Sequence, residues 1–148
     1  MELEPVYQIS PFFIIAGAVV FFVLIWTFVI FMLFAASGWR RLAKTFRARG
    51  PVQGDRFTWQ SGRFRLVNYN RILNITVCRE GLLIAVIKLF SLFHPELFIP
   101  WEAVRNVSLT SIFFMKYVRF EIADGKGAVK VHLAAKVLES PHWAVRPK

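Results

Sequence analysis

The first 39 residues contain no lysine and no arginine, and from Phe12 through Ala36 no side chain is ionisable. As a helix, this run of 25 residues would extend roughly 37 Å, enough to cross a hydrocarbon core of about 30 Å. Small residues at Ala35 and Ala36 would also suit signal-peptide cleavage, but the basic segment that begins a signal peptide is missing. The sequence therefore predicts a transmembrane helix over residues 11–37, after an N-terminal tail of residues 1–10.

Cysteine and histidine are also scarce. Cys78 is the single cysteine, which excludes an intramolecular disulfide. The three histidines, His94, His132 and His142, are not at metal-ligand spacing from one another or from Cys78. The chain has no glycine-rich phosphate loop, no nucleophile elbow and no closely spaced carboxylate pair between apolar residues. We therefore expect a protein that is not an enzyme and that holds no metal or cofactor.

Positive charge begins abruptly after the apolar run. The cations of this flank are Arg40, Arg41, Lys44, Arg47 and Arg49. Since basic flanks stay on the cytoplasmic side of a membrane, the sequence predicts a single-pass protein with its N terminus outside and its C-terminal domain in the cytoplasm. Residues 37–148 hold 19 Lys and Arg against seven Asp and Glu, a formal charge of +12.

A domain this basic beside a bilayer has an obvious partner in anionic lipid. The five cations of the flank are our predicted headgroup contacts, within a juxtamembrane segment and linker of residues 38–54. Tyr7, Trp39 and Phe46 are the predicted interfacial anchors. The stripe of Trp39 and Phe46 either lies in the headgroup region or packs on the following domain, and the sequence leaves both open. No nucleic-acid-binding signature is present, which favours lipid over nucleic acid.

From residue 55 the apolar period changes from that of a helix to that of a strand. Runs such as Val118–Ile122 and Val129–Leu133 alternate apolar with polar residues. Turn signals separate the runs at Asn68–Asn70, Arg79–Gly81 and Asp124–Gly127. The sequence predicts an antiparallel β domain of seven or eight strands over residues 55–135, and a C-terminal tail of residues 136–148.

The segment after Gly81 is apolar for longer than one strand requires. Leu82–Ile87 predicts a buried strand, and the loop behind it carries Phe90, Leu92 and Phe93. Lys88 and other charges argue against a second membrane span. This loop either folds over the core or dips into the nearby membrane.

Two segments resemble a known family. Arg79–Ile84, followed by an apolar strand and then Leu97–Val104 with its Ile-Pro-Trp sequence, is similar to the turn, strand and Trp turn of pleckstrin-homology-like (PH-like) and GRAM-like domains. Small bacterial membrane proteins join such a domain to one helix, and the similarity covers roughly residues 55–135. The resemblance implies a β-barrel, a bacterial inner-membrane location, and Trp101 packed beneath the sheet. A long C-terminal helix usually closes that barrel, and only Ala134–Glu139 could be helical here, so we expect a partly open barrel of about seven strands.

These observations favour a membrane-anchored, non-enzymatic binding or scaffold module whose basic cytoplasmic domain contacts anionic lipid headgroups. The alternative is an accessory or assembly subunit of a membrane protein complex, acting through a membrane-protein partner.

Overall fold

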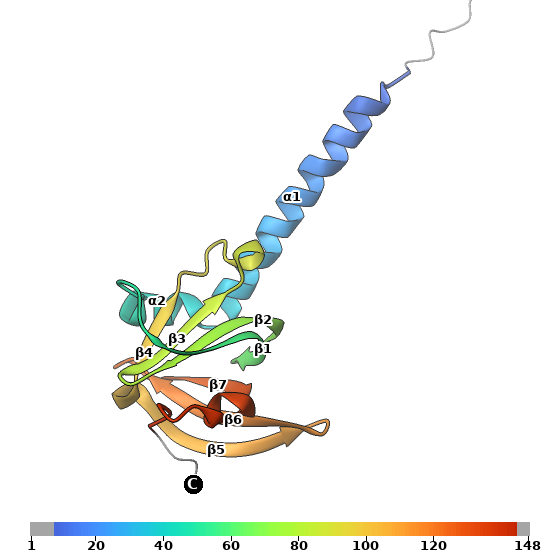
Figure 1. Cartoon of the computed structure of the whole chain (residues 1–148). Coiled ribbons are helices and arrows are strands. Elements are labelled where there is room, and N and C mark those ends of the chain that lie inside the picture. The colour runs from blue at the N-terminus through green and yellow to red at the C-terminus, as the bar shows by residue number, and fades with distance from the viewer. Residues whose placement is uncertain (1–7, 145–148) are drawn as a thin grey trace, which may run out of the picture.

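The computed structural model describes residues 8–144, in which two α-helices precede a β domain (Figure 1). The helices are α1 (Pro11–Ala36) and α2 (Trp39–Phe46). The strands are β1 (Gly54–Phe64), β2 (Val67–Cys78), β3 (Gly81–Val86), β4 (Leu97–Pro100), β5 (Val104–Ile112), β6 (Met115–Ala123) and β7 (Ala128–Ala134). Short 3₁₀ helices are η1 (Lys88–Phe90), η2 (Trp101–Ala103) and η3 (Ala135–Glu139).

Helix α1 projects from the β domain as a separate rod (Figure 1). It begins with Pro11, whose fixed φ suits the first helical position. Among the described residues, α1 is the one helix long and apolar enough to cross a bilayer. Its apolar side chains are largely exposed, and Ile30 is its one buried residue. The predicted helix of residues 11–37 is confirmed as a helix to within one residue.

The seven strands form one antiparallel sheet in the order β4-β3-β2-β1-β7-β6-β5. The edge strands β4 and β5 do not pair with each other, so the sheet is not closed into a barrel. This confirms the predicted antiparallel β domain of about seven strands, whereas the partly open PH-like barrel stays a prediction. Part of the β4 edge is covered by the chain that leaves α2, where Ala48 N–H donates to the Glu96 carbonyl at 2.9 Å.

The hydrophobic core extends beyond residues 55–135 at both ends. Trp39 and Leu42 of α2 are fully buried in it, and so are Val137 and, nearly, Trp143 near the C terminus. Trp101 is buried as expected from the resemblance. Its indole N–H lies 3.1 and 3.0 Å from the carbonyl oxygens of residues 78 and 79, and its ring lies 5.1 Å from that of Trp143. Both flanks of the strand region therefore belong to the folded domain.

One predicted turn is wrong. Asn68–Asn70 lies inside β2, and Tyr69 between the two asparagines is buried. The chain reverses instead at Arg65 and Leu66. The turns predicted at Arg79–Gly81 and Asp124–Gly127 are both present.

Candidate functional site

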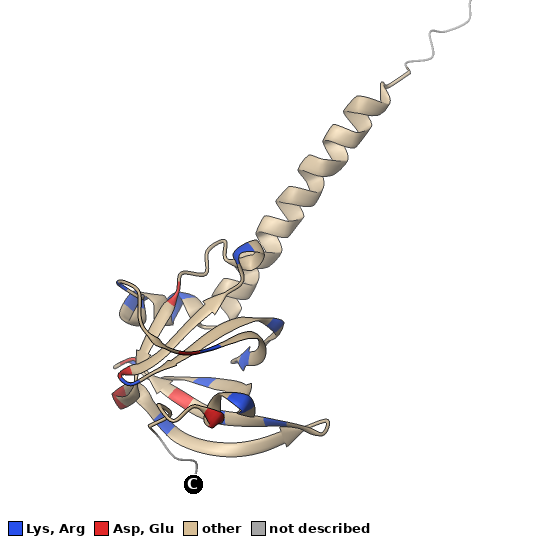
Figure 2. Cartoon of the chain, viewed as in Figure 1, with Lys and Arg blue, Asp and Glu red and all other residues tan. Residues whose placement is uncertain are grey.

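Helix α1 joins the β domain through a sharp turn. The Ser37 N–H donates to the Leu33 carbonyl at 2.9 Å, and Gly38 then adopts a φ of +79°. That left-handed conformation favours glycine, and a Cβ at position 38 would also lie 3.0 Å from Cδ of Arg65. Because the turn is this short, the cations of α2 follow directly after the apolar helix (Figure 2).

Helix α2 places its apolar and basic side chains on different faces. The Trp39 indole N–H donates to the Pro95 carbonyl at 2.9 Å, and its ring lies 5.0 Å from that of Phe64. Arg40 and Lys44 are exposed on the other face. The stripe of α2 therefore packs on the β domain, which is one of the two interpretations that the sequence left open.

A first hollow, of about 530 Å³, lies at the end of α1. It is lined by Ala35, Gly38, Arg40, Arg41, Lys44, Thr45, Arg65, Asp124 and Lys126. Ala35 belongs to the last turn of α1, so the hollow begins where the apolar helix ends. Its cations come from three places that are distant in sequence: α2, the β1–β2 turn and the β6–β7 turn.

Arg41 differs from the other cations of this hollow because it is paired. Its guanidinium makes two hydrogen bonds with Asp124, from Nε to Oδ2 and from Nη2 to Oδ1, the latter at 2.8 Å. These bonds hold the pKa of the Asp124 carboxyl below its usual range. Within residues 8–144 this is the one ion pair, and it ties α2 to the β6–β7 turn. Arg41 thus has a structural partner, whereas the side chains of Arg40, Lys44, Arg65 and Lys126 have no carboxylate partner within residues 8–144.

A second hollow, of about 610 Å³, lies on the side of α1 that faces the β3–β4 connection. It is lined by Phe34, Arg40, Ala43, Lys44, Arg47, Ala48, Arg49, Phe93 and Pro95. Arg40 and Lys44 line both hollows. We call the exposed cations around the end of α1 the basic collar. Its members are Arg40, Lys44, Arg47, Arg49, Arg65 and Lys126.

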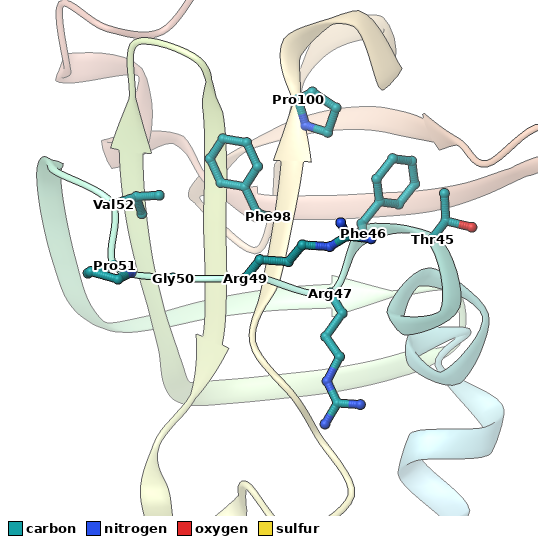
Figure 3. A pocket seen from close by; sticks show the side chains of 9 residues that line it. All are labelled: Thr45, Phe46, Arg47, Arg49, Gly50, Pro51, Val52, Phe98 and Pro100. Atoms are coloured by element: carbon teal, nitrogen blue, oxygen red, sulfur yellow. The ribbon is translucent and has the colours of Figure 1, made fainter.

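A third hollow, of about 500 Å³, lies farther along the domain and is more apolar (Figure 3). Phe46, Phe98 and Pro100 line it together with the segment that follows α2. In Figure 3 the Arg47 side chain points toward the end of the domain where α1 joins it, whereas the Phe46 ring points away from that end. Arg47 and Arg49 line both this hollow and the second one, whereas Phe46 lines this hollow and neither of the first two.

The predicted site residues do not all lie in one place. The exposed cations Arg40, Lys44, Arg47 and Arg49 gather around the end of α1, while Arg41 is held by Asp124. For the predicted anchors, Trp39 is fully buried, Phe46 is partly buried, and Tyr7 lies outside the described residues. Sequence reasoning missed Arg65 and Lys126, which two turns bring to the first hollow.

The titratable side chains that line the three hollows are arginines, lysines and Asp124. The one buried pair, Tyr69 and His94, lines none of the three. Within residues 8–144, no group of three or more His, Cys, Asp or Glu side chains could hold a metal ion. Exposed cations without a carboxylate partner, gathered at the end of one helix, are chemically suited to bind an anion.

The protein is thus a long apolar helix joined to an open seven-stranded antiparallel β domain, with cations at the junction. No protein-family model, no curated protein and no solved structure matches this chain.

Proposed function

We propose that this chain is a membrane-anchored, non-enzymatic binding module in which α1 spans the bilayer and the basic collar binds anionic lipid headgroups. One observation carries the proposal: hollows lined by unpaired cations begin at the last turn of an uncharged helix. A headgroup phosphate beside α1 would lie at this level.

The exposed surface of α1 supports the membrane span. A helix of 26 residues with one buried side chain would leave a large apolar surface in water, which favours a lipid environment. Leu33 and Phe34 near its end also pack against the hydrophobic core of the domain. Cleavage after Ala36 would remove these contacts, which argues for an anchor that is retained.

Orientation follows from the distribution of charge. With five cations after α1 and no Lys or Arg before it, the β domain faces the cytoplasm and the N terminus lies outside. The resemblance to bacterial membrane proteins extends this proposal to a bacterial inner membrane. In this orientation the collar faces the leaflet with the negative surface potential.

A PH-like identity for the β domain is part of the proposal. Two successive antiparallel meanders, β1–β4 and β5–β7, joined by the pairing of β1 with β7, support it. The buried Trp101 after Ile99 and Pro100 supports it as well. The long C-terminal helix of that family has no counterpart in the described residues, and α2 instead contributes Trp39 and Leu42 to the core.

The test uses the full chain reconstituted in vesicles that contain spin-labelled phosphatidylglycerol or phosphatidylcholine. The fraction of motionally restricted label gives the relative association constant of each lipid. Phosphatidylglycerol should be preferred at low salt, and this preference should fall as salt rises because surface charges are screened beyond about 8 Å at physiological ionic strength. Equal restriction of both lipids at low salt would refute headgroup binding.

Two charge reversals locate the site. Lys44→Glu, on the rim of both hollows, should lower the preference for phosphatidylglycerol at least about fivefold, since one well-placed cation contributes about 1 kcal/mol and the new carboxylate repels the headgroup. Lys136→Glu is the matched control, because Lys136 is exposed in η3 and lines none of the hollows at the end of α1. Equal losses in both variants would mean that only net charge acts and that the collar is no site.

A second candidate function is that of an accessory subunit of a membrane complex. The turn between β5 and β6 favours it: Phe113 and Phe114 are fully or nearly fully exposed, and both have positive φ values, 47° and 68°. Bulky residues are strained there, and strain at an exposed apolar tip is a feature of binding sites. In this candidate the tip would contact a protein partner.

A further inference from the structure

The connection between β3 and β4 leaves the sheet and lies against α1. The Phe90 ring of η1 is centred 5.0 Å from that of Trp26, and the Phe93 ring 5.7 Å from that of Phe31. Figure 1 shows η1 beside the domain-proximal part of α1. We refer to residues 87–94 as the β3–β4 loop. It contacts the same helix that we propose to span the bilayer.

The position of Trp26 along α1 sets the depth of this contact. Helix α1 has 26 residues and is therefore roughly 39 Å long, about 9 Å more than a hydrocarbon core of about 30 Å. Trp26 lies ten residues before Ala36, or about 15 Å from the end of the helix. Even if all the excess length lies at this end, Trp26 is still about 6 Å inside the hydrocarbon, and tilting the helix increases that depth.

Three side chains of the loop are apolar and exposed, including that of Phe93, whose ring also contacts Phe31. The exposed fractions of Leu89, Leu92 and Phe93 are 68%, 48% and 42%. In water these three would form a costly apolar surface, whereas among acyl chains each contributes favourably to insertion. The exposed apolar surface of the loop therefore suits lipid beside the helix.

The loop backbone makes several of its own hydrogen bonds, which lowers the cost of leaving water. Phe90 N–H donates to the Ile87 carbonyl at 2.9 Å, Ser91 N–H to the Lys88 carbonyl at 3.2 Å, and His94 N–H to the Ser91 carbonyl at 2.9 Å. The Ser91 hydroxyl also donates to the Lys88 carbonyl, at 2.8 Å. In these two successive turns, backbone N–H and carbonyl groups that hydrocarbon could not satisfy form hydrogen bonds within the loop.

Lys88 is the one charged residue of the loop, and it opposes insertion. Its side chain is exposed, and a lysine near a membrane surface can bury its methylene stem while its ammonium reaches the headgroups. The loop can therefore enter the hydrocarbon only to a depth from which the Lys88 ammonium still reaches the headgroups.

We propose that the β3–β4 loop is a second membrane-inserted element, which places Leu89, Leu92 and Phe93 among the acyl chains of the leaflet nearest the β domain. This inference rests on the proposed span by α1. One helix alone would let the domain tilt about its anchor, whereas helix and loop together hold it in one orientation. The basic collar is then fixed at the level of the headgroups.

The experiment uses single added cysteines in the full chain, labelled with an environment-sensitive fluorophore and reconstituted in vesicles with or without acyl-brominated phosphatidylcholine. Leu89→Cys and Leu92→Cys report on the loop, and either alone suffices if the other fails to fold. Leu109→Cys on β5 is the control at an exposed apolar position of the β domain, and Phe21→Cys reports on the middle of α1. Cys78 is not replaced, because it is buried. Treating the chain without an added cysteine with the fluorophore measures whether Cys78 is labelled.

Brominated lipid should quench the labels at positions 21, 89 and 92 and leave the label at 109 bright. If the label at 21 is quenched while the labels at 89 and 92 stay as bright as that at 109, the loop insertion is overturned and the span by α1 stands. This result is expected if a partner protein covers the loop. Absence of quenching at 21 would overturn the span, and the loop insertion with it.

Discussion

The Tyr69 hydroxyl lies 3.1 Å from Nε2 of His94, and both side chains are buried. His94 Nδ1 lies 3.0 Å from the Leu92 carbonyl, which can only accept, so Nδ1 carries the proton and donates it to that carbonyl. Nε2 then accepts from the tyrosine hydroxyl, and the imidazole is neutral. Burial raises the pKa of Tyr69 to about 12 and lowers the pKa of His94 below its usual value.

We expect acid to destabilise the domain through His94. Because its pKa is lower in the folded than in the unfolded state, the unfolded chain binds more protons once the pH falls below about 6.5, and the free energy of unfolding decreases toward the folded-state pKa. The slope from one such group is at most about 1.4 kcal/mol per pH unit. Urea unfolding of the full chain in detergent micelles between pH 7.5 and 5 measures it.

His94→Gln removes the titrating group and should reduce this slope. Part of the slope should remain, because burial and the nearby charges of Arg119 and Arg63 also lower the pKa of His132. His132→Asn is therefore the companion variant. A slope unchanged in His94→Gln would show that His94 is not held neutral in the folded protein.

Two neighbouring arginines of α2 should have different roles, Arg41 in the stability of the domain and Arg40 in lipid binding. Arg41→Met leaves the nearly inaccessible Asp124 carboxylate without its guanidinium partner, with the Lys126 N–H as a remaining donor, and should lower the stability of the domain. Arg40→Met touches no ion pair and should lower the preference for phosphatidylglycerol while leaving the melting temperature unchanged. Thermal unfolding and the spin-label assay on the same samples test both, and an interchange of the two effects would contradict these roles.

Two tryptophans offer a matched test of the core. Trp39→Ala should cost about 3 to 5 kcal/mol, because the Trp39 side chain is fully buried and makes a hydrogen bond to Pro95. Trp59→Ala should cost less than about 0.5 kcal/mol, because the Trp59 side chain is exposed. Denaturant midpoints of the two variants check this, and equal values would mean that α2 does not pack on the β domain.

Membrane topology is tested at the end of the chain. A reporter that is active only in the cytoplasm, fused after Lys148, should be active, because cations follow α1 and none precede it. Reversing Arg40, Lys44 and Arg47 together to Glu should lower that activity by weakening the bias. A silent fusion, with activity from a reporter specific for the outer compartment, would overturn the orientation.

The sequence predicts those elements whose signal is local. An uncharged run of 25 residues predicts α1, and Asp124–Gly127 predicts a hairpin because its Asp and Gly residues suit a turn. Asn68 and Asn70 are misleading because asparagine is a common turn residue, yet here both are exposed on a strand whose other face buries Tyr69. The apolar and polar alternation through these residues is the signal that favours a strand.

The site is harder to predict because it is assembled from distant segments. Arg40 and Lys44 are evident as cations beside an apolar helix, but Arg65 and Lys126 reach the first hollow only through sheet pairing. Periodicity shows that Trp39 lies on an apolar stripe, and it cannot say whether that stripe meets lipid or protein. The contact of Phe90 with Trp26 depends in the same way on where the loop falls beside α1.

The β5–β6 turn holds two bulky residues in the left-handed region of backbone conformation. Ile112 pairs with Met115, so Phe113 and Phe114 form a two-residue loop, and positive φ at both positions marks a type I′ turn. Such turns favour Asn-Gly, and a bulky residue in the left-handed region costs about 1 to 2 kcal/mol. The double variant Phe113→Asn, Phe114→Gly should therefore raise the free energy of unfolding by about 1 to 2 kcal/mol.

Two exposed aromatic residues that cost stability point to a contact made outside the chain. Affinity purification from the native membrane should recover a partner with the unmodified protein and lose it with the Asn-Gly variant. A control substitution, Leu66→Ser in the β1–β2 turn, also removes an exposed apolar side chain and should leave recovery unchanged. A variant that is more stable and recovers the same proteins would show that the β5–β6 turn is not the partner contact, and a variant that is less stable would contradict the strain on which the argument rests.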